Sequence, residues 1–112
     1  MASARNPAVF VDVDDTLVRT VGPKRIPIPA TVRLVRALRE QGAVLYLWSR
    51  GGPDYAREVA EELGLAESFD GFLPKPELLL DDASFERWGT VALHPAECAS
   101  LSAEGVLALV KR

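Results

Sequence analysis

The chain of 112 residues contains little of the chemistry on which several protein classes depend. Its one cysteine, Cys98, excludes an internal disulfide and a zinc site built from several cysteines. Its one histidine, His94, precedes a proline, and we interpret it as a loop residue near the rim of the site rather than a catalyst. No stretch approaches the roughly 20 apolar residues of a membrane span, and residues 1–7 lack the apolar core of a signal peptide. We therefore expect a cytoplasmic protein with no membrane partner.

The chain also lacks an excess of basic residues. Its formal net charge is −3 and its pI is about 5.1, so the composition does not indicate a nucleic-acid partner bound through a broad basic surface. The 48% hydrophobic and 26% charged residues are typical of a soluble globular protein. The length suits one small domain, and we expect that domain to span residues 1–112.

Apolar runs and helical spacing alternate along the chain, which predicts an α/β fold. Residues 18–29 contain three prolines and a glycine, which exclude a helix interior and favour an extended, hairpin-like flap. In chain order we expect a strand at 8–14, the flap at 18–29, a helix from Pro29 to Gly42, a strand at 43–48, a helix from Pro53 to Gly64, a short strand or bridge at 71–73, strands at 78–80 and 90–93, and a helix at 102–110. This order predicts a Rossmann-like three-layer α/β/α sandwich, with a mostly parallel central sheet covered on both faces.

Three carboxylates within four positions follow the first apolar run. Because side chains alternate along a strand, Asp12 and Asp14 are expected on the same face. Two acids so close together at the end of a buried strand repel each other unless a cation lies between them, and oxygen ligands suit Mg²⁺. The alternative is a polar turn without a metal.

Polar residues also end two other predicted strands. Ser49 and Arg50 follow the run at 43–48, and Asp81 and Asp82 follow the run at 78–80. In a parallel sheet these ends lie at one edge, where open α/β sheets bind their ligands. Lys75 stands shortly before the last predicted strand and is expected to reach the same edge.

These residues, in this order, resemble the four motifs of the haloacid dehalogenase superfamily. The segment from Asp12 to Thr16 resembles its first motif, Asp-x-Asp-x-Thr, and Ser49, Lys75 and the Asp81-Asp82 pair fall on the other three. The resemblance implies that Asp12 is a nucleophile and Asp14 a general acid and base. It also implies that Ser49 and Lys75 bind the phosphoryl group, and that Mg²⁺ is held by Asp12, Asp14 and Asp82, with Asp81 in support.

The activity implied by this resemblance is that of a Mg²⁺-dependent phosphatase without a cap domain, because the spacing between the motifs leaves no room for one. An open site of this kind suggests a macromolecular substrate or a second subunit that covers it, although a small phosphorylated molecule also remains a candidate substrate. We expect Arg50 to contact substrate. The third motif departs from the family, because Lys75 runs almost directly into the next predicted strand.

Other interpretations of the same residues stay open. A phosphotransferase would use the same aspartyl-phosphate, a receiver domain uses similar residues around Mg²⁺, and a binding module could keep the fold without catalysis. Individually, Ser49 suits a turn, Lys75 a solvated surface, Arg50 a surface ion pair, and the Asp81-Asp82 pair the cap of a short helix near residues 84–88. In the flap, Lys24 and Arg25 are candidates for attracting an anionic substrate.

Overall fold

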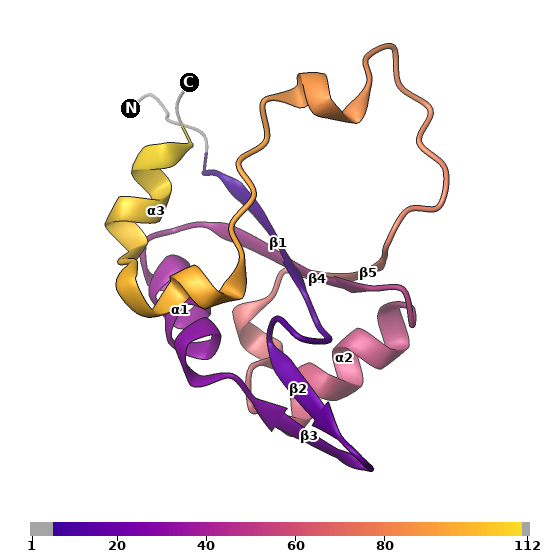
Figure 1. The fold of residues 1–112 in the computed structure, drawn as a ribbon, viewed down its shortest axis with the longest axis vertical. Coiled ribbons are helices and arrows are strands. Elements are labelled where there is room, and N and C mark those ends of the chain that lie inside the picture. The colour runs from indigo at the N-terminus through magenta and orange to yellow at the C-terminus, as the bar shows by residue number, and fades with distance from the viewer. Residues whose placement is uncertain (1–5, 111–112) are drawn as a thin grey trace.

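The computed structural model describes residues 6–110, and the predictions made for residues 1–5, 111 and 112 lie outside this range. It is a compact α/β structure built on a three-stranded parallel sheet (Figure 1). The sheet consists of β1 (Ala8–Asp12), β4 (Val44–Ser49) and β5 (Gly71–Pro74), in the order β1-β4-β5. A separate antiparallel hairpin is formed by β2 (Val18–Val21) and β3 (Lys24–Pro27). The helices are α1 (Pro29–Glu40), α2 (Pro53–Glu62) and α3 (Ala103–Leu109), with short 3₁₀ helices η1 (Ala66–Ser68), η2 (Phe85–Trp88) and η3 (Pro95–Ser100).

The expected elements are confirmed from the first strand to the short strand after α2. Both α1 and α2 begin with proline in the first turn, where its missing N–H costs no hydrogen bond. The flap is the β2-β3 hairpin, and the predicted short strand at 71–73 is β5. The expected helix near the end of the chain is α3, which contacts α1.

The core lies between one face of the sheet and the two crossover helices. Leu45 and Leu47 of β4 are fully buried and belong to one apolar cluster with residues of both helices, Leu34, Val35, Leu38, Ala56, Val59 and Ala60. Two successive right-handed crossovers in the same direction place their helices on the same face of a parallel sheet. That arrangement sets the strand order and brings all three carboxyl ends to one edge.

The predicted third layer is wrong for the described residues. On the opposite face, Phe10 is 45% exposed, and Tyr46 and Trp48 are only partly buried. The rings instead pack on one another, with the Phe10 centroid 5.1 Å from that of Tyr46 and 4.7 Å from that of Trp48. The chain would have to reverse and add strands beyond β1 to carry a helix to this face, and no such strand is present between residues 6 and 110.

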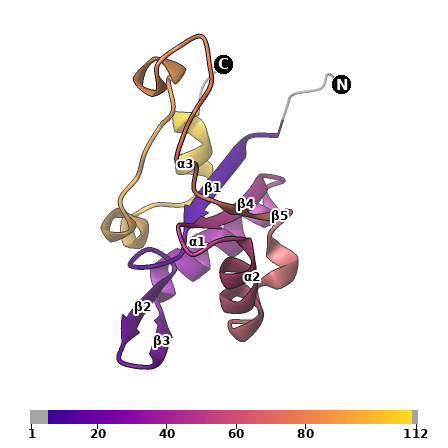
Figure 2. The same ribbon diagram turned by 90° about the vertical axis from the view of Figure 1, so that its right-hand side faces the viewer.

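The strands predicted at 78–80 and 90–93 are also wrong. Leu78 is 81% exposed and Leu80 is 94% exposed, and neither range belongs to a strand. Figures 1 and 2 both show the chain between β5 and η3 as a wide loop that leaves the sheet and returns beside α1 and α3. An apolar run becomes a strand only where a neighbouring strand accepts its backbone hydrogen bonds, and here the run has no such neighbour.

None of the described helices is long and apolar enough to cross a membrane.

Candidate active site

The first strand ends in a tight turn that fixes Asp12. The N–H of Leu17 and of Val18 both bond to the carbonyl of Val13, at 2.9 and 3.1 Å. Asp15 has φ of 62°, a left-handed conformation that aspartate tolerates better than most residues. This turn brings the Thr16 hydroxyl to 3.4 Å from Asp12 Oδ2, so the two ends of the Asp-x-Asp-x-Thr segment face each other.

The second strand end is held by Ser49. This side chain is buried, and its Oγ accepts a hydrogen bond from the N–H of Gly51 at 2.9 Å. The Ser49 carbonyl accepts the N–H of Gly52 at 3.1 Å and that of Lys75 at 3.0 Å. Ser49 therefore shapes the loop that opens α2 and ties it to the end of β5, which combines the predicted turn role with a place at the site.

Lys75 reaches Asp12, the predicted nucleophile, directly from the end of β5. Its Nζ lies 3.3 Å from Asp12 Oδ1 and 5.9 Å from the centroid of the Trp48 ring. Asp12, Trp48 and Leu73 are register partners in β1, β4 and β5, so the lysine crosses the middle strand to meet Asp12. Both partners of this ion pair are about one third exposed, which leaves room for a ligand beside them. The abbreviated third motif therefore does not prevent contact with Asp12.

Asp14 has a partner that the sequence analysis missed. Tyr55, in the first turns of α2, donates a hydrogen bond from its hydroxyl to Asp14 Oδ1 at 2.7 Å. Burial and then this hydrogen bond raise the pKa of the Tyr55 phenol above 10.0, so it stays a neutral donor at physiological pH. In the sequence, Tyr55 stands four residues before Val59, a spacing that is equally typical of a core residue on a helix. Its position just after the Ser49 loop was the signal, because the start of a crossover helix lies beside the strand ends.

The flap cation Arg25 is already paired within the molecule. Its guanidinium lies 2.9 Å from Glu62 and 3.4 Å from Glu58, and it stacks over Tyr55 at 5.2 Å from the ring centroid. Lys24 is exposed near the tip of the hairpin, so the predicted role in attracting an anionic substrate stays a prediction for Lys24. Arg25 instead anchors the flap to α2 and supports the tyrosine that holds Asp14.

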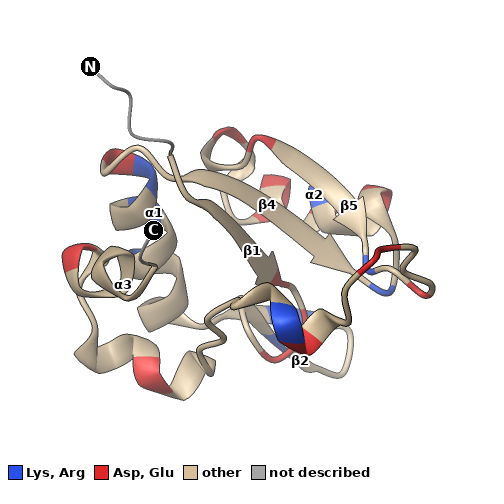
Figure 3. Ribbon diagram, turned by 90° about the horizontal axis from the view of Figure 1, so that it is seen from above, with Lys and Arg blue, Asp and Glu red and all other residues tan. Residues whose placement is uncertain are grey.

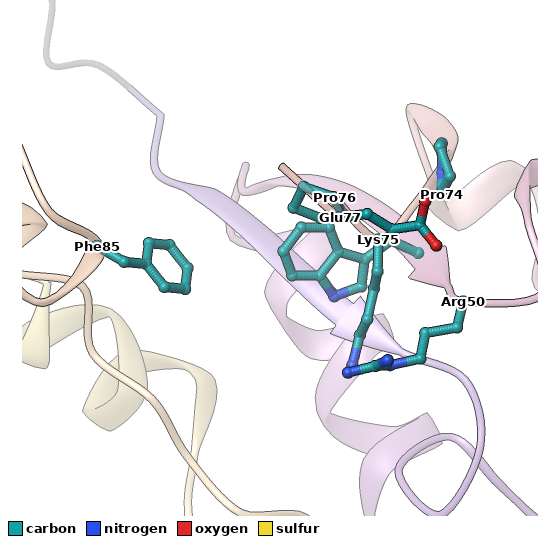
Figure 4. Close-up of a pocket in the computed structure, with 7 residues that line it drawn as sticks. Arg50, Pro74, Lys75, Pro76, Glu77 and Phe85 are labelled. Atoms are coloured by element: carbon teal, nitrogen blue, oxygen red, sulfur yellow. The ribbon is translucent and has the colours of Figure 1, made fainter. Parts of the chain in front are cut away.

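Arg50 and Lys75 line one hollow beside the strand ends. Its volume is about 760 Å³, and its other lining residues are Trp48, Pro74, Pro76, Glu77 and Phe85. Figure 4 shows the side chains of Arg50 and Lys75 converging, with the ring of Phe85 on the opposite side. Lys75, which contacts Asp12, and Arg50, which converges with Lys75, suit an anionic ligand, because they offset negative charge that the Asp12 carboxylate alone would repel.

The predicted metal ligands do not come together. Asp81 and Asp82 are exposed on the loop after β5, and Asp81 Oδ1 accepts the N–H of Ala83 at 2.9 Å, as a local turn residue. Between residues 6 and 110, no group of three or more His, Cys, Asp or Glu side chains could hold a metal ion. The described arrangement therefore does not form the predicted Mg²⁺ site, and it leaves Asp12 and Asp14 as the acids at the strand ends.

Charge is otherwise scattered over the molecule. Viewed from above in Figure 3, acidic and basic segments of the described residues lie on several separate elements. No family model, no curated protein and no solved structure matches the chain.

Proposed function

We propose that this protein is a phosphatase that acts through an aspartyl-phosphate on Asp12, in a single-domain fold of the haloacid dehalogenase type. The observation that carries the proposal is the 3.3 Å contact between Lys75 and Asp12, made at the edge where Ser49 ends the neighbouring strand. A nucleophilic carboxylate, a phosphate-binding cation and a hydroxyl are the groups that this chemistry needs.

In the first step a carboxylate oxygen of Asp12 attacks the phosphorus of a phosphate monoester. The new bond joins that oxygen to phosphorus, and the bond from phosphorus to the ester oxygen breaks. Lys75 fixes the Asp12 carboxylate, and with Arg50 it offsets the negative charge on the phosphoryl oxygens. Ser49 shapes the loop that carries Arg50 to this anion site.

Asp14 is the proposed proton carrier for both steps. In its acid form it gives a proton to the leaving oxygen, and as a carboxylate it then takes a proton from the water that attacks the aspartyl-phosphate. The second step breaks the bond between Asp12 and phosphorus, which releases inorganic phosphate and restores the carboxylate. Tyr55 positions Asp14 through its 2.7 Å hydrogen bond and does not itself contact the reacting atoms.

A requirement for Mg²⁺ stays a prediction. The described residues do not assemble the three acids that it would use, and no step above depends on the metal. Mg²⁺ often binds proteins through only one or two carboxylates and completes its shell with waters and substrate phosphates.

Replacement of the nucleophile tests the proposal. Asp12→Asn keeps the size of the side chain and removes the attacking charge, so we expect turnover of phosphate monoesters to fall at least about 1,000-fold, which is the scale of losing a catalytic group outright. Asp15→Asn is the matched control, because Asp15 lies in the same turn and asparagine tolerates its left-handed backbone. Both variants should melt at the same temperature as the wild type, within a few degrees.

A second readout follows the intermediate itself. Acid-quenched wild-type protein should carry one phosphoryl group on Asp12, detected by mass spectrometry of its peptides, and Asp12→Asn should carry none. Full turnover in Asp12→Asn would overturn the assignment. If the phosphoryl group on Asp12 is transferred to an added alcohol faster than to water, the protein is a phosphotransferase instead.

A further inference from the structure

The hollow lined by Lys75, the partner of Asp12, contains two aromatic rings that the proposed chemistry does not use. Trp48 is the last but one residue of β4, and Phe85 begins η2 on the loop after β5, yet both line the same space as Lys75 and Arg50. Figure 4 shows Phe85 across the hollow from the two cations. An anion site bordered by aromatic rings suits a ligand that is charged at one end and flat and apolar at the other.

Each of these rings is supported from one side by another ring. Phe10 packs edge-on against Trp48 at 4.7 Å between centroids, and Trp88 packs edge-on against Phe85 at 4.8 Å. Phe85 is nevertheless 55% exposed, so it has unused apolar surface where the hollow is. Rings fixed in this way lose little freedom when a third ring stacks on them.

The distances among Lys75, Asp12 and Trp48 limit how far the aromatic ring of a ligand can lie from its phosphorus atom. Lys75 Nζ is 3.3 Å from Asp12 and 5.9 Å from the centroid of Trp48, and Asp12 and Trp48 are register partners on adjacent strands. Adjacent strands are about 4.8 Å apart. A ring that packs on Trp48 therefore lies next to a phosphoryl group at Asp12. A ring bonded to phosphorus through one oxygen fits this distance, whereas a nucleotide holds its base a whole sugar away.

We propose that the hollow is the leaving-group subsite for aryl phosphates, the chemistry that a phosphotyrosine side chain presents. This inference rests on the proposed function, because it assigns the group that departs when Asp12 is phosphorylated. Trp48 and Phe85 hold the aryl ring, while Lys75 and Arg50 hold the phosphoryl end. The ring leaves as a phenol after Asp14 supplies the proton.

The first test measures binding without turnover. Phenylphosphonate and methylphosphonate share the charged group, and their carbon–phosphorus bonds are not hydrolysed. We expect the wild type to bind phenylphosphonate about tenfold more tightly by titration calorimetry, and Phe85→Ala to lose most of that difference, because ring stacking contributes on this scale. Leu80→Ala is the matched control, since Leu80 is exposed on the same loop and does not line the hollow. Equal affinities of the wild type for the two phosphonates would overturn the inference.

The second test separates this inference from the phosphatase proposal. Phe85→Ala should lower kcat/KM about fivefold more for 4-methylphenyl phosphate than for glycerol phosphate. A larger loss for adenosine monophosphate than for the aryl ester would overturn the aryl assignment in favour of a nucleotide. Ring-selective phosphonate binding without any turnover would overturn the phosphatase and support the ring site alone. Turnover with no preference for aromatic substrates would support the phosphatase and overturn the ring site.

Discussion

Two parts of this chain carry similar apolar patterns and have opposite structures. Residues 8–74 form the sheet, the hairpin and the two crossover helices, and they supply most of the buried apolar cluster. In residues 75–97, by contrast, no side chain is buried, although this stretch contains three consecutive leucines, Phe85 and Trp88.

The difference teaches that an apolar run predicts burial only when the chain can bring a partner to it. The run at 43–48 is enclosed by strands on both sides and by helices on one face, and each of those partners is adjacent in the chain order. The sheet has free edges at β1 and β5, and the run at 78–80 pairs with neither, because the described chain loops away from the sheet. Both runs are apolar, and they differ in whether the fold places neighbouring strands beside them.

The largest expected effect comes from a matched pair of leucines. Leu47→Ala should lower the free energy of unfolding by about 2–5 kcal/mol, because it leaves a cavity in a close-packed core. Leu80→Ala should change it by less than about 0.5 kcal/mol, because this side chain is already 94% exposed. Chemical denaturation of both variants measures the contrast. A loss for Leu80→Ala as large as that for Leu47→Ala would mean that 78–80 is a buried strand after all.

The acids of the loop give the next comparison. If the loop joins the site when Mg²⁺ binds, Asp82→Ala should raise the Mg²⁺ concentration for half-maximal activity about tenfold or more, whereas Asp81→Ala should raise it less. The Asp81 carboxylate already accepts the N–H of Ala83, and this local bond makes it the poorer ligand. Chelation by EDTA should abolish turnover, and added Mg²⁺ should restore it.

Each contrary result has a definite meaning. Full activity after chelation would remove the metal from the reaction. No effect of either substitution on the Mg²⁺ requirement would show that the loop stays away from Asp12 and Asp14, as described here. A larger effect of Asp81→Ala would exchange the two assignments.

Tyr55→Phe sharpens the comparison within residues 8–74. It removes the hydrogen bond to Asp14, so kcat/KM for an alkyl phosphate should fall about tenfold, the scale of one hydrogen bond to a charged group. The loss should be much smaller for 4-nitrophenyl phosphate, whose leaving oxygen needs no proton. Burial and the bond to Asp14 raise the pKa of the phenol above 10.0, so the loss should be constant from pH 6 to pH 9. An equal loss for both esters would reduce Tyr55 to a structural role.

The contrast between residues 8–74 and the loop after β5 also explains which features could be predicted from the sequence. The sheet core, the flap, both proline-started helices and the meeting of Asp12, Ser49 and Lys75 follow from strand ends and crossover rules, which act over short stretches of chain. The Tyr55–Asp14 bond was hidden because a tyrosine in a helical stripe carries the same periodic signal as any core residue. The loop after β5 was mispredicted because its apolar runs form strands only if they pair with a strand edge of the sheet. A local sequence pattern does not show whether such pairing occurs.

The smallest expected effect comes from comparing an acid within residues 8–74 with an acid of the loop after β5. Asp70 Oδ2 accepts the N–H of Leu45 at 3.0 Å and pairs with Arg39 at 2.6 Å, so it ties α1 to the sheet just before β5. The backbone bond and then the arginine hold the pKa of Asp70 below its ordinary 3.8. A carboxyl with a lowered pKa in the folded state stabilises the fold above pH 3.8 and loses that contribution as the pH falls through its folded pKa.

Asp70→Asn should therefore be less stable than the wild type at pH 7, and the difference should shrink below about pH 4. Asp81→Asn, whose oxygen serves only its own turn, should track the wild type at both pH values. Thermal melts of the two variants at pH 7 and pH 3 decide the matter, and a pH-independent loss in Asp70→Asn would mean that its tie does not depend on charge.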